Sequence, residues 1–231
     1  MCGRYLLNMT EQEVTERFGA REWLRDVRIA PRFNVAPTQL MPVVLAEEEG
    51  RRVATVMRWG FIAPWAKDLS RTPINARAET VAESRLFKAA LAHRRCLVPA
   101  TGFYEWVTRG KAKMRVRFSL KNGAPFAFAG LWSTWRDPTG EPVESFTILT
   151  TAPNALVAKV HDRMPAIVPE SAYMAWLSCD RNPPEQALRV IGPYLESEMA
   201  ATPVSTRVNS PAHDDASLLD PIEGQMGFDL S

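Results

Sequence analysis

The stretch Gly102-Phe103-Tyr104-Glu105-Trp106-Val107 lies near the middle of the chain and predicts a β-strand rich in aromatic side chains. Successive side chains of a strand point to opposite faces, so the odd-numbered residues, with Glu105 among them, share one face. Tyr104 and Trp106 share the other. Both faces are largely apolar, which predicts a strand inside the core. Further strands of this central region are predicted at 96–98, 114–120, 126–131 and 146–151.

Helices and additional strands are predicted on both sides of this centre. Thr10 with Glu13, and Thr80 with Glu83, form capping boxes that open two of the helices. A strand-rich middle with helices around it predicts one α+β domain, built on a curved antiparallel sheet or barrel. Helices are predicted at 10–18, 80–93, 153–160, 170–177 and 184–195, strands at 40–46, 52–59, 164–168 and 204–208, and an extended loop at 60–74.

The composition is that of a globular protein. The 231 residues are 46% hydrophobic and 23% charged, and the net charge of +2 does not by itself indicate a nucleic-acid partner. The chain shows neither an apolar run of membrane-spanning length nor a signal peptide, so a cytoplasmic protein without membrane contact is expected. The 3 cysteines and 3 histidines are scattered, which predicts neither a disulfide framework nor a metal or cofactor site.

The second residue of the chain is a cysteine, Cys2. Aminopeptidases remove an initiator methionine before a small residue, and removal of Met1 would give Cys2 a free α-amine beside its thiol. Such a 1,2-aminothiol reacts with an aldehyde, because the amine forms an imine and the thiol closes onto the same carbon as a five-membered ring. The alternative is a cysteine without function in a frayed N-terminus.

Three further polar positions stand out from their surroundings. Glu105 lies between apolar faces, where burial would raise its pKa toward the range of a general acid–base group; an ion pair with an arginine is the alternative. His161 lies at a helix-to-strand junction and is either a proton carrier or a structural histidine. Asn75 and Arg77 precede the predicted helix at 80–93 and, taken alone, read as turn residues.

Several short motifs occur together and in a fixed order. The motifs are Met1-Cys2-Gly3-Arg4, Arg32-Phe33-Asn34-Val35-Ala36-Pro37, Trp59-Gly60-Phe61, Asn75-Ala76-Arg77-Ala78-Glu79-Thr80, Gly102-Phe103-Tyr104-Glu105-Trp106, His161-Asp162-Arg163-Met164-Pro165, Val204-Ser205 with Val208-Asn209, and Leu218-Leu219-Asp220-Pro221-Ile222. With these motifs the chain resembles the SRAP (SOS-response-associated peptidase) family from Cys2 to about Ile222. The resemblance implies one SRAP domain at residues 1–222 and a C-terminal tail at residues 223–231.

The resemblance implies a DNA-damage-response protein that binds single-stranded DNA and captures abasic sites covalently. The ring-opened abasic sugar is an aldehyde, and the Cys2 aminothiol would convert it to a thiazolidine that shields the strand from cleavage. This is imine chemistry of the lyase type, and it needs no cofactor. The expected partner is single-stranded DNA that contains an abasic site, the expected location is on DNA in the cytoplasm, and the expected state is a monomer.

The resemblance also assigns roles to individual residues. Cys2 would be the nucleophile, Glu105 the proton shuttle, His161 the group that protonates the sugar ring oxygen, and Asn75 the group that orients Cys2. Some members carry two adjacent tryptophans where this chain has Trp65-Ala66, which predicts weaker base stacking there. The expected DNA contacts are Arg4, Asn34, Pro37, Trp65, Arg77, Trp106 and Arg163.

Two other functions remain open at this point. Cys2, His161 and Asn75 could form the Cys–His–Asn arrangement of a cysteine peptidase, with the Met1–Cys2 bond of the chain itself as its substrate. A protein that binds single-stranded DNA without covalent capture is the second alternative. In that case Cys2→Ala would leave binding and function intact.

Overall fold

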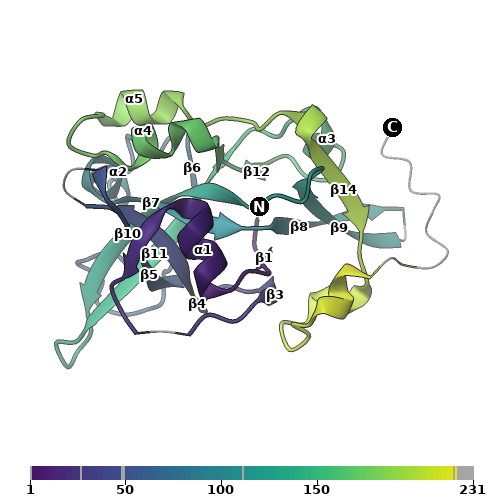
Figure 1. Ribbon diagram of the computed structural model, residues 1–231, viewed down its shortest axis with the longest axis horizontal. Helices are drawn as coiled ribbons and strands as arrows, with labels where there is room; N and C mark the ends of the chain where they lie inside the picture. The colour runs from purple at the N-terminus through teal and green to yellow at the C-terminus, as the bar shows by residue number, and fades with distance from the viewer. Residues whose placement is uncertain (1, 27, 48–49, 111, 221, 223–231) are drawn as a thin grey trace.

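The centre of the molecule is a β-barrel. The computed structural model describes residues 2–26, 28–47, 50–110, 112–220 and 222 (Figure 1). Within these residues, neighbouring strands of the barrel follow the order β11-β10-β7-β4-β5, and β5 pairs again with β11. The closing pair is parallel, Ser145 opposite Arg58 and Phe146 opposite Trp59. The strands are β4 (Leu40–Ala46), β5 (Arg52–Trp59), β7 (Arg95–Ala100), β10 (Phe126–Arg136) and β11 (Pro142–Thr151).

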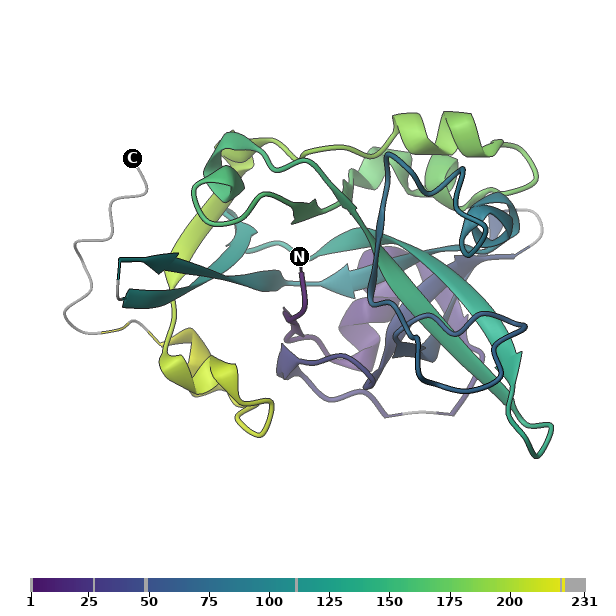
Figure 2. The ribbon, with the colours of Figure 1, turned by 180° about the vertical axis from the view of Figure 1, so that it is seen from behind.

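A second sheet of five strands lies beside the barrel, with the order β14-β9-β8-β1-β3 among the described residues. Its first strand, β1, lies beside β8 at the centre of the molecule in both views (Figures 1 and 2). The Tyr5 ring of β1 packs against barrel residues, with centroids 5.1 Å from Trp59 and 5.8 Å from Phe128. The strands are β1 (Tyr5–Leu7), β3 (Arg32–Val35), β8 (Gly102–Arg109), β9 (Ala112–Leu120) and β14 (Met199–Pro203).

Short elements complete the fold around these two sheets. Helix α1 (Glu11–Phe18) begins at the predicted capping box and ends at Gly19, whose φ of 61° is the left-handed conformation that favours glycine. The remaining helices are α2 (Lys88–His93), α3 (Ala155–Ala158), α4 (Tyr173–Leu177) and α5 (Pro184–Arg189), with 3-10 turns at Glu170–Ala172, Glu196–Glu198, Thr206–Asn209 and Ala216–Leu219. The remaining strands are β2 (Ala20–Trp23), β6 (Asn75–Arg77), β12 (Met164–Pro165) and β13 (Ile167–Val168).

The predicted α+β fold with a barrel-like core is confirmed, with one difference in its pairing. The sequence predicts antiparallel strands, and the ladders β4–β5, β7–β10, β8–β9 and β10–β11 follow that rule. The barrel closes, however, through the parallel β5–β11 pair, and β6 also runs parallel to β11. These pairs join segments far apart in sequence, so no local turn signal announces them.

Two predicted elements are wrong in position or extent. Residues 80–87 form turns rather than the first half of a helix, because Glu83 N–H bonds only as far back as the Thr80 carbonyl, and the helix begins at Lys88. The last strand, predicted at 204–208, lies instead at Met199–Pro203, paired with β9. After it, the Ser205 hydroxyl accepts the Arg207 N–H and opens a 3-10 turn.

Other boundaries differ less. The predicted strand at 164–168 divides into β12 and β13, because Ala166 N–H donates to β11 while its carbonyl accepts from β10. The helix predicted at 170–177 is a 3-10 turn followed by α4, and the helix predicted at 184–195 ends at Arg189. The predicted tail at 223–231 lies outside the described residues.

Candidate functional site

The pairing of β1 with β8 brings Cys2 close to Glu105. Tyr5 lies opposite Phe103, and the Tyr104 N–H donates to the Arg4 carbonyl at 3.0 Å, so the first residues of the chain run alongside the Glu105 segment. Cys2 is fully buried, and its Sγ lies 3.7 Å from the Arg4 carbonyl oxygen. Burial, followed by the nearby charge of Glu105, raises the pKa of the Cys2 thiol, which therefore stays protonated at neutral pH.

Glu105 is a buried carboxyl group, with only 2% of its surface exposed. Burial raises its pKa from 4.5 to about 7, with the Asp162 carboxylate contributing in the same direction. A carboxyl that titrates near 7 can both accept and release a proton under physiological conditions. The burial predicted for Glu105 is observed, and its general acid–base role stays a prediction.

Asn75 touches Cys2 directly. It opens β6, which is held parallel to β11 with Asn75 opposite Ile148. The Asn75 Nδ2 donates to the Cys2 carbonyl oxygen at 2.9 Å. The other amide atom, Oδ1, is buried and has no hydrogen-bond partner among the described residues. Asn75 therefore orients the Cys2 backbone and keeps one acceptor atom available.

His161 follows α3, whose first turn is capped by Asn154. Its Nδ1 accepts the Arg163 backbone N–H at 3.0 Å and also lies 2.9 Å from the Asp162 Oδ1. These contacts need different protonation states, because Nδ1 must be free of a proton to accept and protonated to pair with Asp162. Burial lowers the pKa of His161, which favours the neutral ring with its proton on Nε2.

Arg163 is held by a carboxylate of the Asn75–Thr80 motif. Its guanidinium donates to both carboxylate oxygens of Glu79, at 2.8 and 2.7 Å, and to the Thr150 carbonyl at 2.7 Å. Only 13% of the Arg163 side chain is exposed. The ion pair connects the loop that carries His161 to the segment that follows β6. The segments that carry Asn75 and His161 are therefore held next to each other. The DNA contact predicted for Arg163 stays a prediction.

Arg4 and Asn34 connect β1 and β3 to the C-terminal segment. The Arg4 Nη1 donates to the Asn34 Oδ1 and to the Val208 carbonyl, both at 2.8 Å. Asn34 is fully buried, and its Nδ2 donates to the carbonyls of Val208, Ser210 and His213. Asn34 thus holds the segment against the sheet, and its predicted DNA contact remains untested.

Trp106 is half-buried beside Arg4. Its Nε1 donates to the Asn209 Oδ1 at 2.9 Å, and the Arg4 Cζ lies 5.9 Å from the centroid of its ring. Both contacts fix the orientation of the indole. Trp106 and Arg4, predicted separately as DNA contacts, therefore form one surface.

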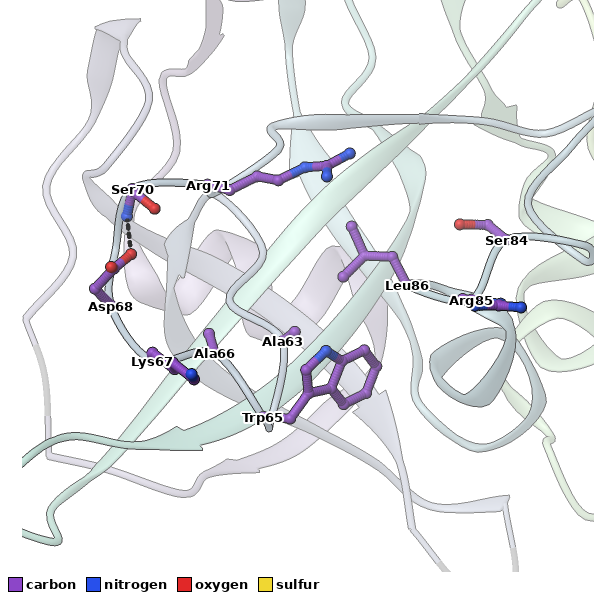
Figure 3. A pocket seen from close by; sticks show the side chains of 10 residues that line it. All are labelled: Ala63, Trp65, Ala66, Lys67, Asp68, Ser70, Arg71, Ser84, Arg85 and Leu86. Carbon is purple, nitrogen blue, oxygen red and sulfur yellow. Dashed lines mark hydrogen bonds between the residues drawn. The ribbon is translucent and has the colours of Figure 1, made fainter.

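The remaining predicted DNA contacts lie outside this cluster. Arg77 is exposed at the end of β6. Pro37 is half-buried in a turn whose next residue, Thr38, adopts a φ of 76°. Trp65 is 62% exposed and borders a pocket of about 560 Å³ together with Leu86. Figure 3 shows this pocket, whose other lining residues include the basic side chains Lys67, Arg71 and Arg85.

Three residues near the site were not among the predicted functional residues: Glu79, Arg115 and Asn209. Glu79 and Asn209 belong to motifs that the sequence shows, but their partners are 84 and 103 residues away. Only the register of the strands identifies those partners.

Among the described residues, no group of three or more acidic, cysteine or histidine side chains could hold a metal ion. No helix within the same residues has the length and apolar character needed to span a membrane.

The chain is similar to proteins of known family. A family model described as "SOS response associated peptidase (SRAP)" matches residues 1–211. The abasic site processing protein YoqW of Bacillus subtilis is 38% identical over 223 residues, which cover 95% of this chain and 99% of YoqW. The abasic site processing protein HMCES of Gallus gallus is 31% identical over 265 residues, covering 96% of this chain and 78% of HMCES.

Solved structures have the same fold. A protein from Bacteroides thetaiotaomicron superimposes with a TM-score of 0.85 at 24% identity, covering 96% of this chain and 100% of that chain. A protein from Bordetella bronchiseptica gives a TM-score of 0.77 at 26% identity, covering 88% and 100%. The fold is therefore shared with both proteins.

Proposed function

The chain belongs to the SOS response associated peptidase family, and on that premise we propose that it processes abasic sites by capturing them covalently through Cys2 in single-stranded DNA. The observation that carries the proposal is the contact between the Asn75 Nδ2 and the Cys2 carbonyl, at 2.9 Å, next to the buried carboxyl of Glu105. This arrangement holds the second residue of the chain in a defined place, where a frayed terminus would be mobile.

The proposed reaction uses both nucleophilic atoms of Cys2 after removal of Met1. The amine attacks the aldehyde carbon of the ring-opened sugar, and loss of water gives an imine. The sulfur then attacks the imine carbon, and the thiol proton passes to the nitrogen as the thiazolidine ring closes. The raised pKa of the buried thiol favours this order, because the amine must react before the neutral thiol does.

Glu105 and His161 supply the proton transfers. Glu105, with a pKa of about 7, takes the proton that the attacking amine loses and returns one to the departing hydroxyl. The neutral His161 with its proton on Nε2 donates to the ring oxygen of the sugar and so favours the open aldehyde. The Asn75 Oδ1, buried and unpartnered among the described residues, would accept from the Cys2 amine.

Binding of the strand is proposed to rest on the predicted contacts. Arg4 and Arg77 would bind phosphates, Arg163 would do so from its pair with Glu79, and Trp106 would stack on a base. Trp65 would stack on another base of the strand. We propose that the protein acts as a monomer on DNA in the cytoplasm.

The peptidase alternative has less support. In a Cys–His–Asn arrangement the asparagine orients the histidine, and its Oδ1 accepts the imidazole N–H. Here the Asn75 Oδ1 has no such partner among the described residues, and the Asn75 Nδ2 donates to the Cys2 carbonyl oxygen. The remaining peptidase proposal is a single cleavage of the chain's own Met1–Cys2 bond. The masses of the purified wild-type and His161→Ala proteins test it when methionine aminopeptidase is inhibited in the host: loss of Met1 that depends on His161 would require self-cleavage.

A denaturing gel tests the main proposal. Protein shown by mass to lack Met1 is mixed with a single-stranded oligonucleotide that bears one abasic site, without a reductant. A band of lower mobility that survives denaturation is expected. An uncleaved N-terminal tag should remove the band, because the Cys2 nitrogen is then an amide. No band from the mature protein would contradict the proposal.

A further inference from the structure

Arg115 lies directly opposite Trp106 in the β8–β9 ladder and shares its face of the sheet. We propose that Arg115 contacts the phosphate backbone of a DNA strand beside Trp106, and that Asn209 positions both side chains. This inference rests on the proposed binding of single-stranded DNA and extends the binding surface away from Cys2.

Strand order places an arginine on each side of the indole. β8 lies between β9 and β1 in the second sheet, so Arg115 comes from one neighbouring strand and Arg4 from the segment that leads into the other. The Arg4 guanidinium carbon lies 5.9 Å from the centroid of the Trp106 ring. A base stacked on an indole has phosphates on either side of it along the strand, and the guanidinium groups of Arg4 and Arg115 supply positive charge for such phosphates.

Asn209 contacts two of these side chains through one atom. Its Oδ1 accepts from the Trp106 Nε1 at 2.9 Å and from the Arg115 Nε at 3.0 Å. The preceding residue of the same 3-10 turn, Val208, accepts from the Arg4 Nη1 through its carbonyl. One turn of the C-terminal segment therefore orients the side chains of Arg4, Trp106 and Arg115.

Arg115 retains its charge for an external partner. Its Nη1 donates to the Lys113 carbonyl, and none of the ion pairs among the described residues includes Arg115. The side chain is only partly buried. By contrast, the Arg163 guanidinium is already matched by Glu79. An anionic ligand such as a phosphate is the partner that the free charge of Arg115 fits.

Salt-dependent binding tests the role of Arg115. Dissociation constants for a fluorescein-labelled oligothymidylate without an abasic site are measured by anisotropy between low and moderate NaCl. For single strands each phosphate contact contributes about 0.7 to the slope of log affinity against log salt. Arg115→Gln should lower the magnitude of that slope by about 0.7, whereas Arg115→Lys should keep the wild-type slope. Arg136→Gln is a matched control, because Arg136 is exposed on the distant β10–β11 hairpin.

A double-mutant cycle tests Asn209. If Asn209 acts through Arg115 and Trp106, Asn209→Ala should weaken binding with little change in slope, and should weaken it less when Arg115→Gln is already present. Additive losses would contradict the positioning role. An unchanged slope for Arg115→Gln, in protein that folds and whose wild type crosslinks abasic DNA, would overturn this inference alone. A wild type that neither binds nor crosslinks would contradict the proposed function itself.

Discussion

Trp106 and Trp65 are both predicted to contact DNA bases, yet the protein holds them in opposite ways. Trp106 stands on a central strand, half-buried, with its Nε1 bonded to Asn209 and Arg4 above its ring. Trp65 stands on the irregular segment between β5 and β6 and is 62% exposed. The Trp106 indole is oriented before any ligand arrives, and we expect the exposed Trp65 indole to be ordered by the ligand.

The contrast separates two kinds of binding surface. Immobilising a flexible side chain at an interface costs about 0.5–1.5 kcal/mol, so Trp65 loses part of its stacking energy to ordering. The groups around Cys2 have already lost that freedom on folding, through the β1–β8 ladder and the Asn75 contact. We therefore expect the rigid region to determine the reaction and the Trp65 segment to adjust to the strand.

The largest expected effect is that of Cys2→Ala. Covalent attachment should be abolished, because neither a thiol nor a ring closure remains, while salt-sensitive binding persists through the arginines. Denaturing gels and anisotropy measure the two properties on one sample. A covalent band that survives denaturation in this variant would rule out the thiazolidine.

Glu105→Gln comes next in size. Loss of a general acid–base group slows a reaction by about 10²- to 10⁴-fold, so attachment should be slow but binding unchanged. The wild-type rate should change with pH near 7, where Glu105 titrates, and the variant should lose that inflection. Single-turnover gels over pH 5–9 measure both. A variant with the wild-type rate and profile would remove Glu105 from the mechanism.

The same substitution should change stability in a defined direction. Between about pH 4.5 and pH 7 folded Glu105 holds a proton that the unfolded chain has released, so folding stability falls as the pH rises through this window. Above pH 7 the free energy of unfolding of the variant should therefore exceed that of the wild type by up to about 3 kcal/mol. The variant should accordingly unfold at a higher temperature. Equal Tm values at pH 8 would contradict the burial argument.

A smaller effect is expected from Arg77→Ala. Arg77 is exposed and is proposed to bind a phosphate, so intact and damaged strands should lose affinity alike. A charge-assisted hydrogen bond of about 1.5 kcal/mol corresponds to roughly a tenfold increase in Kd. Anisotropy with paired oligonucleotides measures the loss. A defect confined to the damaged strand would instead assign Arg77 to the reaction.

The smallest effect is expected from Trp65→Ala. Base–aromatic stacking contributes about 1–3 kcal/mol, and we expect the exposed Trp65 indole to lie near 1 kcal/mol. Trp106→Ala should lie near the upper end, because it also removes the ring beneath Arg4. Unfolding temperature should not change for Trp65→Ala, since the side chain is exposed. Equal losses for the two tryptophans would remove the distinction between the rigid and the adjustable surface.

Local patterns predict the strands of this fold well and its connections poorly. The 102–107 strand, its neighbours and the 40–59 hairpin are confirmed, because alternating apolar residues and turn signals lie within each segment. The helix predicted at 80–93 is half wrong because a capping box is only a local preference. The strand predicted at 204–208 lies earlier because β9 selects its partner by register. Both depend on contacts that a linear pattern does not contain.

The candidate site shows the same division. Motifs identified Cys2, Asn75 and Glu105, and the structure brings Asn75 onto Cys2 and the Glu105 charge within reach of its thiol. Neither the pair of Arg163 with Glu79 nor the burial of Asn34 was predicted. Such contacts join residues far apart in the chain, so residue type alone reveals neither the carboxylate that pairs with an arginine nor the burial of an asparagine.

The Asn34 contacts also affect the order in which the protein becomes competent during its synthesis. Cys2, Arg4 and Asn34 leave the ribosome early, but the carbonyls that hold Arg4 and Asn34 belong to Val208, Ser210 and His213. A nascent or prematurely ended chain therefore carries the reactive cysteine without the assembled surface beside it. The contacts that hold Arg4 and Asn34 form only when nearly all of the described chain has been made.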